Sequence, residues 1–171
     1  MKKLITLIAV IASLSSFATV SPPLTGTATA TGSASIITPI AIATAGNMNF
    51  GSLSVSATAG QVILNAAGNR SANGGVTLPS TTGTVSVASF NVTGLANSTY
   101  SITLPVDDYV ISGAGSNMII NAFTNNLGTT GTLSGEGKQT INVGATLNVK
   151  ASQAAGTYTN STGFGVTVNY N

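Results

Sequence analysis

Apolar and polar residues alternate with a period of two along most of this chain, and that pattern constrains its fold more than any other feature. Such alternation is typical of β-strands with one buried face. No segment keeps a helical period over even three turns, so we predict an all-β protein. The clearest runs are 85–92, 100–104, 141–149 and 164–170, with shorter candidates at 36–42, 62–64, 75–78, 109–111 and 118–123.

Clusters of Gly, Asn and Ser separate these runs and predict turns. We assign turns or loops to 72–75, 94–98, 113–116 and 135–137, and to the segment around Arg70. Strands separated by about 8–12 residues are expected of a sandwich or barrel. We therefore predict one antiparallel β-sandwich domain over residues 36–171.

The first 18 residues have the layout of a secretory signal peptide. Met1-Lys2-Lys3 is basic, residues 4–14 are uncharged and mostly apolar, and Ser16 and Ala18 are small residues of the kind that signal peptidase requires. A membrane span needs about 20 consecutive apolar residues, and polar side chains interrupt this run. We predict cleavage after Ala18, export, and no membrane span in the mature chain.

Residues 19–35 differ from the rest of the chain because only Val20 and Leu24 are large apolar residues. The segment nevertheless alternates, with Ala28, Ala30 and Ala34 on one side and Thr or Ser on the other. Two interpretations remain open. The segment is either a flexible arm that can become a strand or a disordered tail.

Charged residues are few, at 5% of the chain. Beyond residue 18 the cations are Arg70, Lys138 and Lys150, and the anions are Asp107, Asp108 and Glu136. Three scattered cations cannot neutralise a series of phosphates, so nucleic-acid binding is not expected. A chain near zero net charge tends to associate, which suits a subunit that assembles.

The chain also lacks the residues of most catalytic and metal sites. It contains no His, Cys or Trp, which removes the commonest general base, the thiolate nucleophile and most zinc, haem and iron–sulfur ligands. Asp107 and Asp108 are neighbours and would point to opposite faces of a strand. We predict no enzyme activity, no cofactor, no metal and no small-molecule substrate. With four Tyr and no Trp, an aromatic platform for sugar stacking is also not expected.

The C-terminus carries a resemblance. Residues 155–159 (AGTYT) and 163–171 (GFGVTVNYN) are similar to the end of chaperone–usher pilins and spore-coat-U-like pilins, which close with an alternating strand and a penultimate Tyr. Residues 36–171 as a whole resemble the bacterial secreted domain-of-unknown-function family 4402. The resembling segments are IITPIAI (36–42), NFG (49–51), GGVTL (74–78), ASFNVTG (88–94), YSITLP (100–105), VGATL (143–147) and AGTY (155–158).

The likeness to pilins implies an incomplete immunoglobulin-like sandwich that lacks its last strand. In such proteins a periplasmic chaperone, and later the arm of the next subunit, supplies the missing strand at an outer-membrane usher. Carried over to this sequence, the partner-contact residues would be Phe164, Val166, Val168 and Tyr170. The donor arm would present Ala28, Ala30 and Ala34 to another copy of the chain.

We therefore expect a secreted, non-enzymatic structural protein that is a fimbrial or pilus-like subunit, forming a homopolymer by β-strand addition. It would pass through the periplasm to the cell surface, a fimbrium or the medium. The alternative is a free-standing β-sandwich protein of the cell surface or biofilm matrix that does not polymerise.

Overall fold

The computed structural model describes residues 25–81 and 83–171. The chain divides into two units, one ending at Ser35 and the other spanning Ile36–Asn171. In the first unit, residues 25–35 are exposed and belong to no helix or strand. The predicted signal peptide and residues 19–24 lie outside the described residues. The second unit is called the sandwich domain below.

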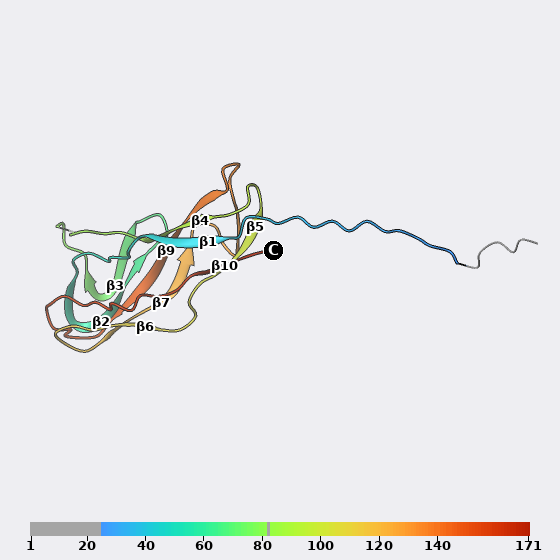
Figure 1. The fold of residues 1–171 in the computed structure, drawn as a ribbon. Coiled ribbons are helices and arrows are strands. Elements are labelled where there is room, and N and C mark those ends of the chain that lie inside the picture. Colours follow the sequence, from blue (N-terminus) through green and yellow to red (C-terminus); the bar gives the residue numbers. More distant parts are fainter. Residues whose placement is uncertain (1–24, 82) are drawn as a thin grey trace, which may run out of the picture. The chain divides into compact units, whose positions relative to one another are not determined.

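Within the described residues the sandwich domain contains ten strands and no helix (Figure 1). The strands are β1 (Ala41–Gly46), β2 (Ser54–Leu64), β3 (Arg70–Thr77), β4 (Ala88–Thr93), β5 (Thr99–Thr103), β6 (Tyr109–Ile111), β7 (Met118–Asn125), β8 (Thr130–Thr132), β9 (Lys138–Val149) and β10 (Thr167–Tyr170).

These strands form two antiparallel sheets. The large sheet has the order β1-β4-β9-β2-β3, and β7 joins it by pairing with β9 and with β6. The small sheet has the order β10-β5-β8. All the strand pairs in the described part of the chain are antiparallel. The predicted all-β antiparallel sandwich is thus confirmed.

Strand β9 organises the large sheet because it is long enough to pair with three others. Its first half pairs with β4, and its second half pairs with β2 and β7. The inward-facing residues Ile141, Val143, Ala145, Leu147 and Val149 are all buried. The period-two run predicted at 141–149 is therefore the central strand of the domain.

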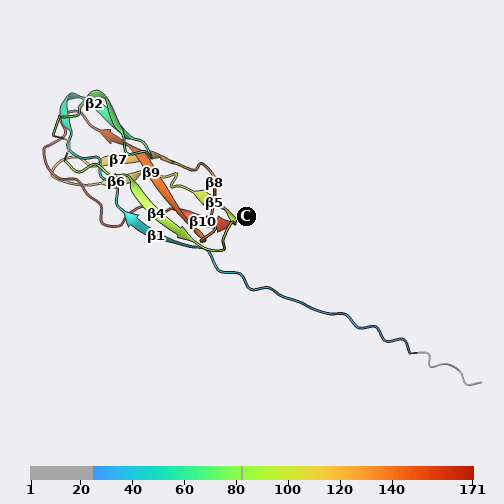
Figure 2. The same ribbon diagram turned by 90° about the horizontal axis from the view of Figure 1, so that it is seen from above.

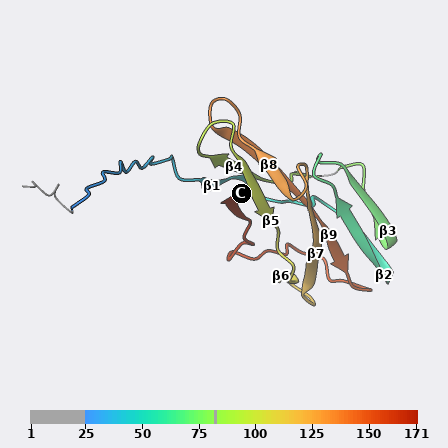
Figure 3. The ribbon, with the colours of Figure 1, turned by 90° about the vertical axis from the view of Figure 1, so that its right-hand side faces the viewer.

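Two apolar clusters fill the interior. The small-sheet cluster lies between β5, β8 and β10 and the facing strands β4 and β9, and it includes Tyr100, Leu133 and Ile141. The second cluster lies on β2, β7 and the second half of β9, and it includes Leu64, Ile120 and Leu147. It is called the groove cluster below, because some of its residues line a groove on the surface. Figures 2 and 3 show β5, β8 and β10 grouped beside β1 and β4, at the opposite end of the domain from β2 and β3. The small sheet therefore covers only one end of the large sheet.

Some expectations about turns and strand limits were wrong. The predicted turn at 72–75 and the predicted loop around Arg70 lie in β3. Glycine is needed there because β2 and β3 approach closely: a Cβ on Gly75 would lie 1.8 Å from the Thr58 carbonyl oxygen, and one on Gly60 would lie 2.4 Å from that of Asn73. Strand β8 was not predicted, because its sequence Thr-Gly-Thr offers no large apolar residue.

The predicted limits of several strands also differ from the observed ones. Strand β1 begins at Ala41 rather than at Ile36, and β10 begins at Thr167 rather than at Phe164. The predicted turns at 94–98, 113–116 and 135–137 do lie between strands.

Candidate functional site

The candidate site begins at the C-terminal strand, β10. Along this strand Val168 is buried and Tyr170 half-buried, whereas Thr167 and Asn169 are exposed. Phe164 and Val166 precede the strand, and both are half-buried. All four of these apolar residues pack against the small-sheet cluster. The structure thus brings together on one side the four residues that the sequence singled out as partner contacts.

The outer edge of β10 is open. Its register against β5 joins Val168 to Ile102 and Tyr170 to Tyr100. The Asn171 N–H donates to the Thr99 carbonyl, and on the other side of β5 the Ile102 N–H donates to the Thr129 carbonyl. Because backbone groups alternate in direction along an antiparallel strand, those of Val168 and Tyr170 point away from β5.

No strand among the described residues pairs with that outer edge. Strand β10 ends the small sheet, and β1 ends the large sheet beside it. Open edges of this kind present unpaired backbone donors and acceptors to which another strand can add.

Tyr170 fixes the end of β10 to two other segments. Its hydroxyl donates to the Thr38 carbonyl (2.9 Å) and accepts a hydrogen bond from the Leu95 N–H (2.6 Å). A Cβ on Gly94 would lie 2.2 Å from that hydroxyl, so only glycine leaves room for it. The penultimate Tyr therefore ties the C-terminal strand to the start of the sandwich domain and to the turn after β4.

Phe164 anchors the chain just before β10 by ring contacts. Its ring centroid lies 4.8 Å from that of Phe123, 5.5 Å from that of Tyr109 and 6.3 Å from that of Phe90. The Phe90 and Tyr109 contacts are edge-to-face, a favoured aromatic geometry. This cluster holds the irregular segment that follows β9 against β4, β6 and β7.

A groove of about 970 Å³ lies next to Phe164. One wall consists of residues 44–55, which take in the end of β1, the connection to β2 and the start of β2, and the other wall is the segment 153–164. Its apolar floor comes from the large sheet. The floor residues are Ala88, Phe90, Ile111, Met118, Ile120 and Leu147. The groove therefore lies over the end of the large sheet that the small sheet leaves uncovered.

One buried polar group in this groove lacks a partner. Gln153 is only 8% exposed, and its amide nitrogen donates to the Ser116 carbonyl. Its Oε1 atom accepts no hydrogen bond anywhere in the described structure. A buried acceptor of this kind is costly unless something supplies a donor. No sequence pattern indicates this group, because it is a lone Gln in an irregular segment.

Arg70 holds the opposite wall. Its Nη1 atom donates to the carbonyls of Phe50 (2.6 Å) and Ser52 (2.7 Å). These bonds fix the wall of the groove from β3, a role that its predicted place in a loop did not indicate.

The remaining candidates are scattered. Ala28, Ala30 and Ala34 are exposed residues of the first unit. Asp108 accepts a hydrogen bond from the Asn121 amide (2.9 Å). Among residues 25–81 and 83–171, no three His, Cys, Asp or Glu side chains gather as they would around a metal ion. In the same residues, no helix is long and apolar enough to cross a membrane.

Comparison with known proteins gives a family match. The family model described as domain of unknown function (DUF4402) matches residues 40–170. No curated protein and no solved structure matches the chain. The matched residues include all ten described strands of the sandwich domain, together with the groove and Tyr170 at the end of β10. The chain therefore belongs to the DUF4402 family.

Proposed function

We propose that this chain is a secreted bacterial structural protein, a fimbrial or pilus-like subunit that assembles by β-strand addition, and not an enzyme. The observation that carries the proposal is the open outer edge of β10, which follows the groove-lining Phe164 closely in the chain. An added strand would pair with the free backbone groups of Val168 and Tyr170. Its side chains would fill the groove, and its backbone could donate to Gln153 Oε1.

The strand donor in this proposal is residues 19–35 of a second copy. The described part of that segment, residues 25–35, is exposed and outside the sandwich domain. The segment is longer than the 12-residue β9 and alternates small apolar with hydroxyl side chains. Ala28, Ala30 and Ala34 would face the acceptor, where Phe164, Val166, Val168 and Tyr170 form the near wall and the adjoining edge. Small Ala side chains bury little area, so this donor would be a weak one.

The proposal includes a route to the surface. Residues 1–18 direct export and are removed in the periplasm. There a chaperone would cover the open edge until an outer-membrane usher adds the next copy. Covering is needed because an unpaired apolar edge is prone to indiscriminate strand pairing.

The experiment compares three exported proteins by size-exclusion chromatography. They are the wild type, a variant that lacks residues 19–35, and Ala30→Ile, each with its own signal peptide. We expect oligomers that survive dilution for the wild type, monomers for the deletion, and a larger oligomeric fraction for Ala30→Ile. Thr31→Ile is the matched control, because Thr31 lies on the other side of the alternating segment. A wild type that stays monomeric at every concentration, in the presence of periplasmic extract, would contradict strand addition.

A free-standing protein of the cell surface or biofilm matrix is the second candidate. The observation that favours it is the length of β10, which has only four residues. Natural proteins use short edge strands to prevent strand addition. In that case the deletion of residues 19–35 leaves both the oligomeric state and the stability nearly unchanged.

A further inference from the structure

A row of amide side chains crosses the outer face of the large sheet. Gln61 on β2 stands directly opposite Asn73 on β3 and Asn148 on β9. Asn148 in turn stands opposite Ile119 on β7. This face is the reverse of the one that carries the groove cluster, because the residues adjacent to Gln61 and Asn148 in sequence, Val62 and Leu147, are buried in that cluster.

The amides are linked head to tail in one direction. Asn73 donates to Gln61 (3.4 Å), Gln61 donates to Asn148 (2.8 Å), and Asn148 donates to Asn121 (2.9 Å). This series of hydrogen bonds ends where the Asn121 amide donates to the carboxylate of Asp108 (2.9 Å). Hydrogen bonds aligned in this way polarise one another. The row is therefore a set of fixed donors and acceptors rather than a group of freely turning side chains.

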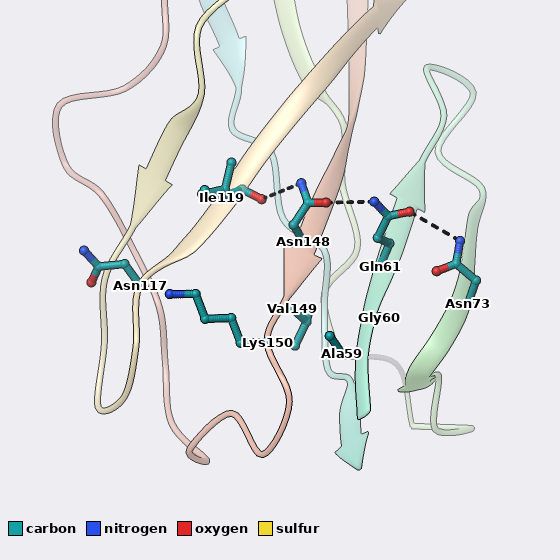
Figure 4. A pocket seen from close by; sticks show the side chains of 9 residues that line it. All are labelled: Ala59, Gly60, Gln61, Asn73, Asn117, Ile119, Asn148, Val149 and Lys150. Carbon is teal, nitrogen blue, oxygen red and sulfur yellow. Dashed lines mark hydrogen bonds between the residues drawn. The ribbon is translucent and has the colours of Figure 1, made fainter. Parts of the chain in front are cut away.

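A hollow of about 440 Å³ opens over this row. Figure 4 shows Lys150 and Asn117 on one side of the hollow, and Gln61 and Asn73 on the other. The apolar residues Ala59, Ile119 and Val149 also line it. The volume lies within the range of about 300–1,000 Å³ that small-molecule sites occupy.

Several polar groups of the hollow remain available. The Oδ1 atom of Asn73, the amide of Asn117 and the ammonium group of Lys150 have no partner within the described part of the chain. Lys150 lies on the outer face because it follows Asn148 by two residues. The hollow thus offers an acceptor, neutral donors and one positive charge around a small apolar surface.

We propose that this hollow binds an acidic saccharide, with a uronic-acid residue placed at Lys150. Each sugar hydroxyl both donates and accepts a hydrogen bond, which matches amides that present both functions in a fixed arrangement. The carboxylate of a uronic acid pairs with the Lys150 ammonium group, and a C–H face of the ring contacts Ile119, which stands opposite Asn148 on the same face. Recognition here depends on amides, so it does not need the aromatic stacking platform that the sequence lacks.

A second protein is a poorer fit for this surface. A stable protein interface buries about 800 Å² on each partner around an apolar centre. On this face the large apolar residues Ile63 and Val110 are 42% and 38% exposed, but they lie on strands separated by β9 and β7. The hollow also shares no lining residue with the groove. Saccharide binding and strand addition can therefore be tested independently of each other.

The test is a titration of the exported protein, labelled with ¹⁵N, with trigalacturonic acid and with its uncharged methyl ester. We expect the side-chain amide resonances of Gln61, Asn117 and Asn148 to shift with the acid. The methyl ester should bind about fivefold more weakly, because an exposed charge pair contributes about 1 kcal/mol or less. Absence of shifts at millimolar acid, or equal affinity for acid and ester, would overturn the proposal.

Two pairs of variants make the test specific. Lys150→Gln should weaken binding of the acid about fivefold, whereas Lys138→Gln removes the same charge from the other end of β9 and should leave affinity unchanged. Asn148→Ala should reduce the affinity for the acid. Asn91→Ala on β4 is its control and should leave the affinity unchanged. It is a matched control because Asn91, like Asn148, accepts a hydrogen bond from a side chain on the neighbouring strand, here Thr140. Equal losses within either pair contradict the site. Shifts of the same amides with protein concentration alone would show that a second copy covers this face, and would also contradict it.

Discussion

The two ends of the sandwich domain differ in what covers the apolar face of the large sheet. At one end the small sheet covers β4 and the first half of β9, and Val92, Tyr100 and Ile141 are completely buried between the two sheets. At the other end irregular chain covers β2, β7 and the second half of β9. There Val62 and Leu64 are also completely buried, whereas Ile111, Met118 and Ile120, which face the groove, keep 5–9% exposure.

The difference extends to the hydrogen bonds. At the small-sheet end, strand ladders pair the backbone groups except along the open outer edge of β10. At the groove end, side chains do much of that work: Arg70 donates to two carbonyls of residues 50–52, and Asn160 donates to the Val110 carbonyl (2.7 Å). A ladder is cooperative, whereas separate side-chain bonds can be lost one at a time. We therefore expect the groove end to open locally at a smaller free-energy cost.

The largest effect should come from a charge placed in the small-sheet end. Val168→Asp puts a carboxylate at a position that is 8% exposed and is surrounded by apolar residues of the small-sheet cluster. We expect the free energy of unfolding to fall by at least about 3 kcal/mol, which is enough to prevent secretion of a marginal domain. Urea unfolding and secreted yield would measure this.

Asn169→Asp is the matched control for that substitution. Asn169 is exposed and points to the other face of β10, so its replacement should change the free energy of unfolding by less than about 0.5 kcal/mol. Equal damage from the two substitutions would show that β10 does not have one buried and one exposed face.

The next prediction tests the contrast between the ends directly by the same truncation at each. Ile141→Ala, at 0% exposure between the sheets, should lower the free energy of unfolding by about 4 kcal/mol. Ile120→Ala, at 5% exposure on the groove floor, should cost about 2 kcal/mol, because water and the irregular walls can adjust to the space. Urea unfolding of the two variants would compare them. If Ile120→Ala costs as much as Ile141→Ala, the irregular cover is as rigid as a sheet.

Sequence patterns predict the small-sheet end of the domain better than the groove end. The core of the small-sheet end lies on strands with clear alternation, such as 100–104 and the first half of the run 141–149, and period two places their buried residues correctly. The groove end depends on segments 44–55 and 153–164, most of which has no period. Local patterns cannot show that Arg70 reaches residues 20 and 18 positions earlier, or that Gln153 is buried without a full set of partners.

Glycines and amides account for most of the other differences. A run such as Asn73-Gly74-Gly75 has the composition of a turn, but its glycines serve the close contact between β2 and β3. The row of Gln61, Asn148 and Asn121 was also not foreseen, because each residue by itself reads as an ordinary polar position on the solvent side of a strand. Only the register between strands brings them together. The C-terminal residues were found because alternation and the penultimate Tyr lie within one short segment.

Smaller losses of stability, of unequal size, should follow from removing the hydroxyl groups of Tyr170 and Tyr158. Tyr170→Phe removes two hydrogen bonds that join distant segments, to Leu95 and to Thr38, and should cost about 1–2 kcal/mol. Tyr158→Phe, beside the groove, removes one bond to the Ala154 carbonyl (2.8 Å), four residues away, and should cost less than about 1 kcal/mol. Thermal unfolding of both variants would measure the difference. A larger loss for Tyr158→Phe would mean that the groove wall is the better-fixed segment.

The smallest effect is a dependence of stability on high pH. The Tyr100 side chain is 0% exposed in the small-sheet cluster, and its hydroxyl donates to Gln139 Oε1 (2.7 Å). Burial raises the pKa of this phenol above its ordinary value of about 10. The native protein then keeps a proton that the unfolded chain has already released. Stability from this source is fully present below about pH 10 and falls as the pH rises through the native pKa.

Tyr100→Phe isolates that dependence. The variant loses some stability at every pH, because the hydrogen bond to Gln139 is gone, but its free energy of unfolding should decline less between about pH 9 and pH 11 than that of the wild type. Urea unfolding at several pH values would give the two slopes. Because Tyr100 lies between the sheets, the difference between the slopes reports on burial at the small-sheet end alone. If the slopes are the same, water reaches Tyr100 in solution, and the small-sheet end is no better closed than the groove end.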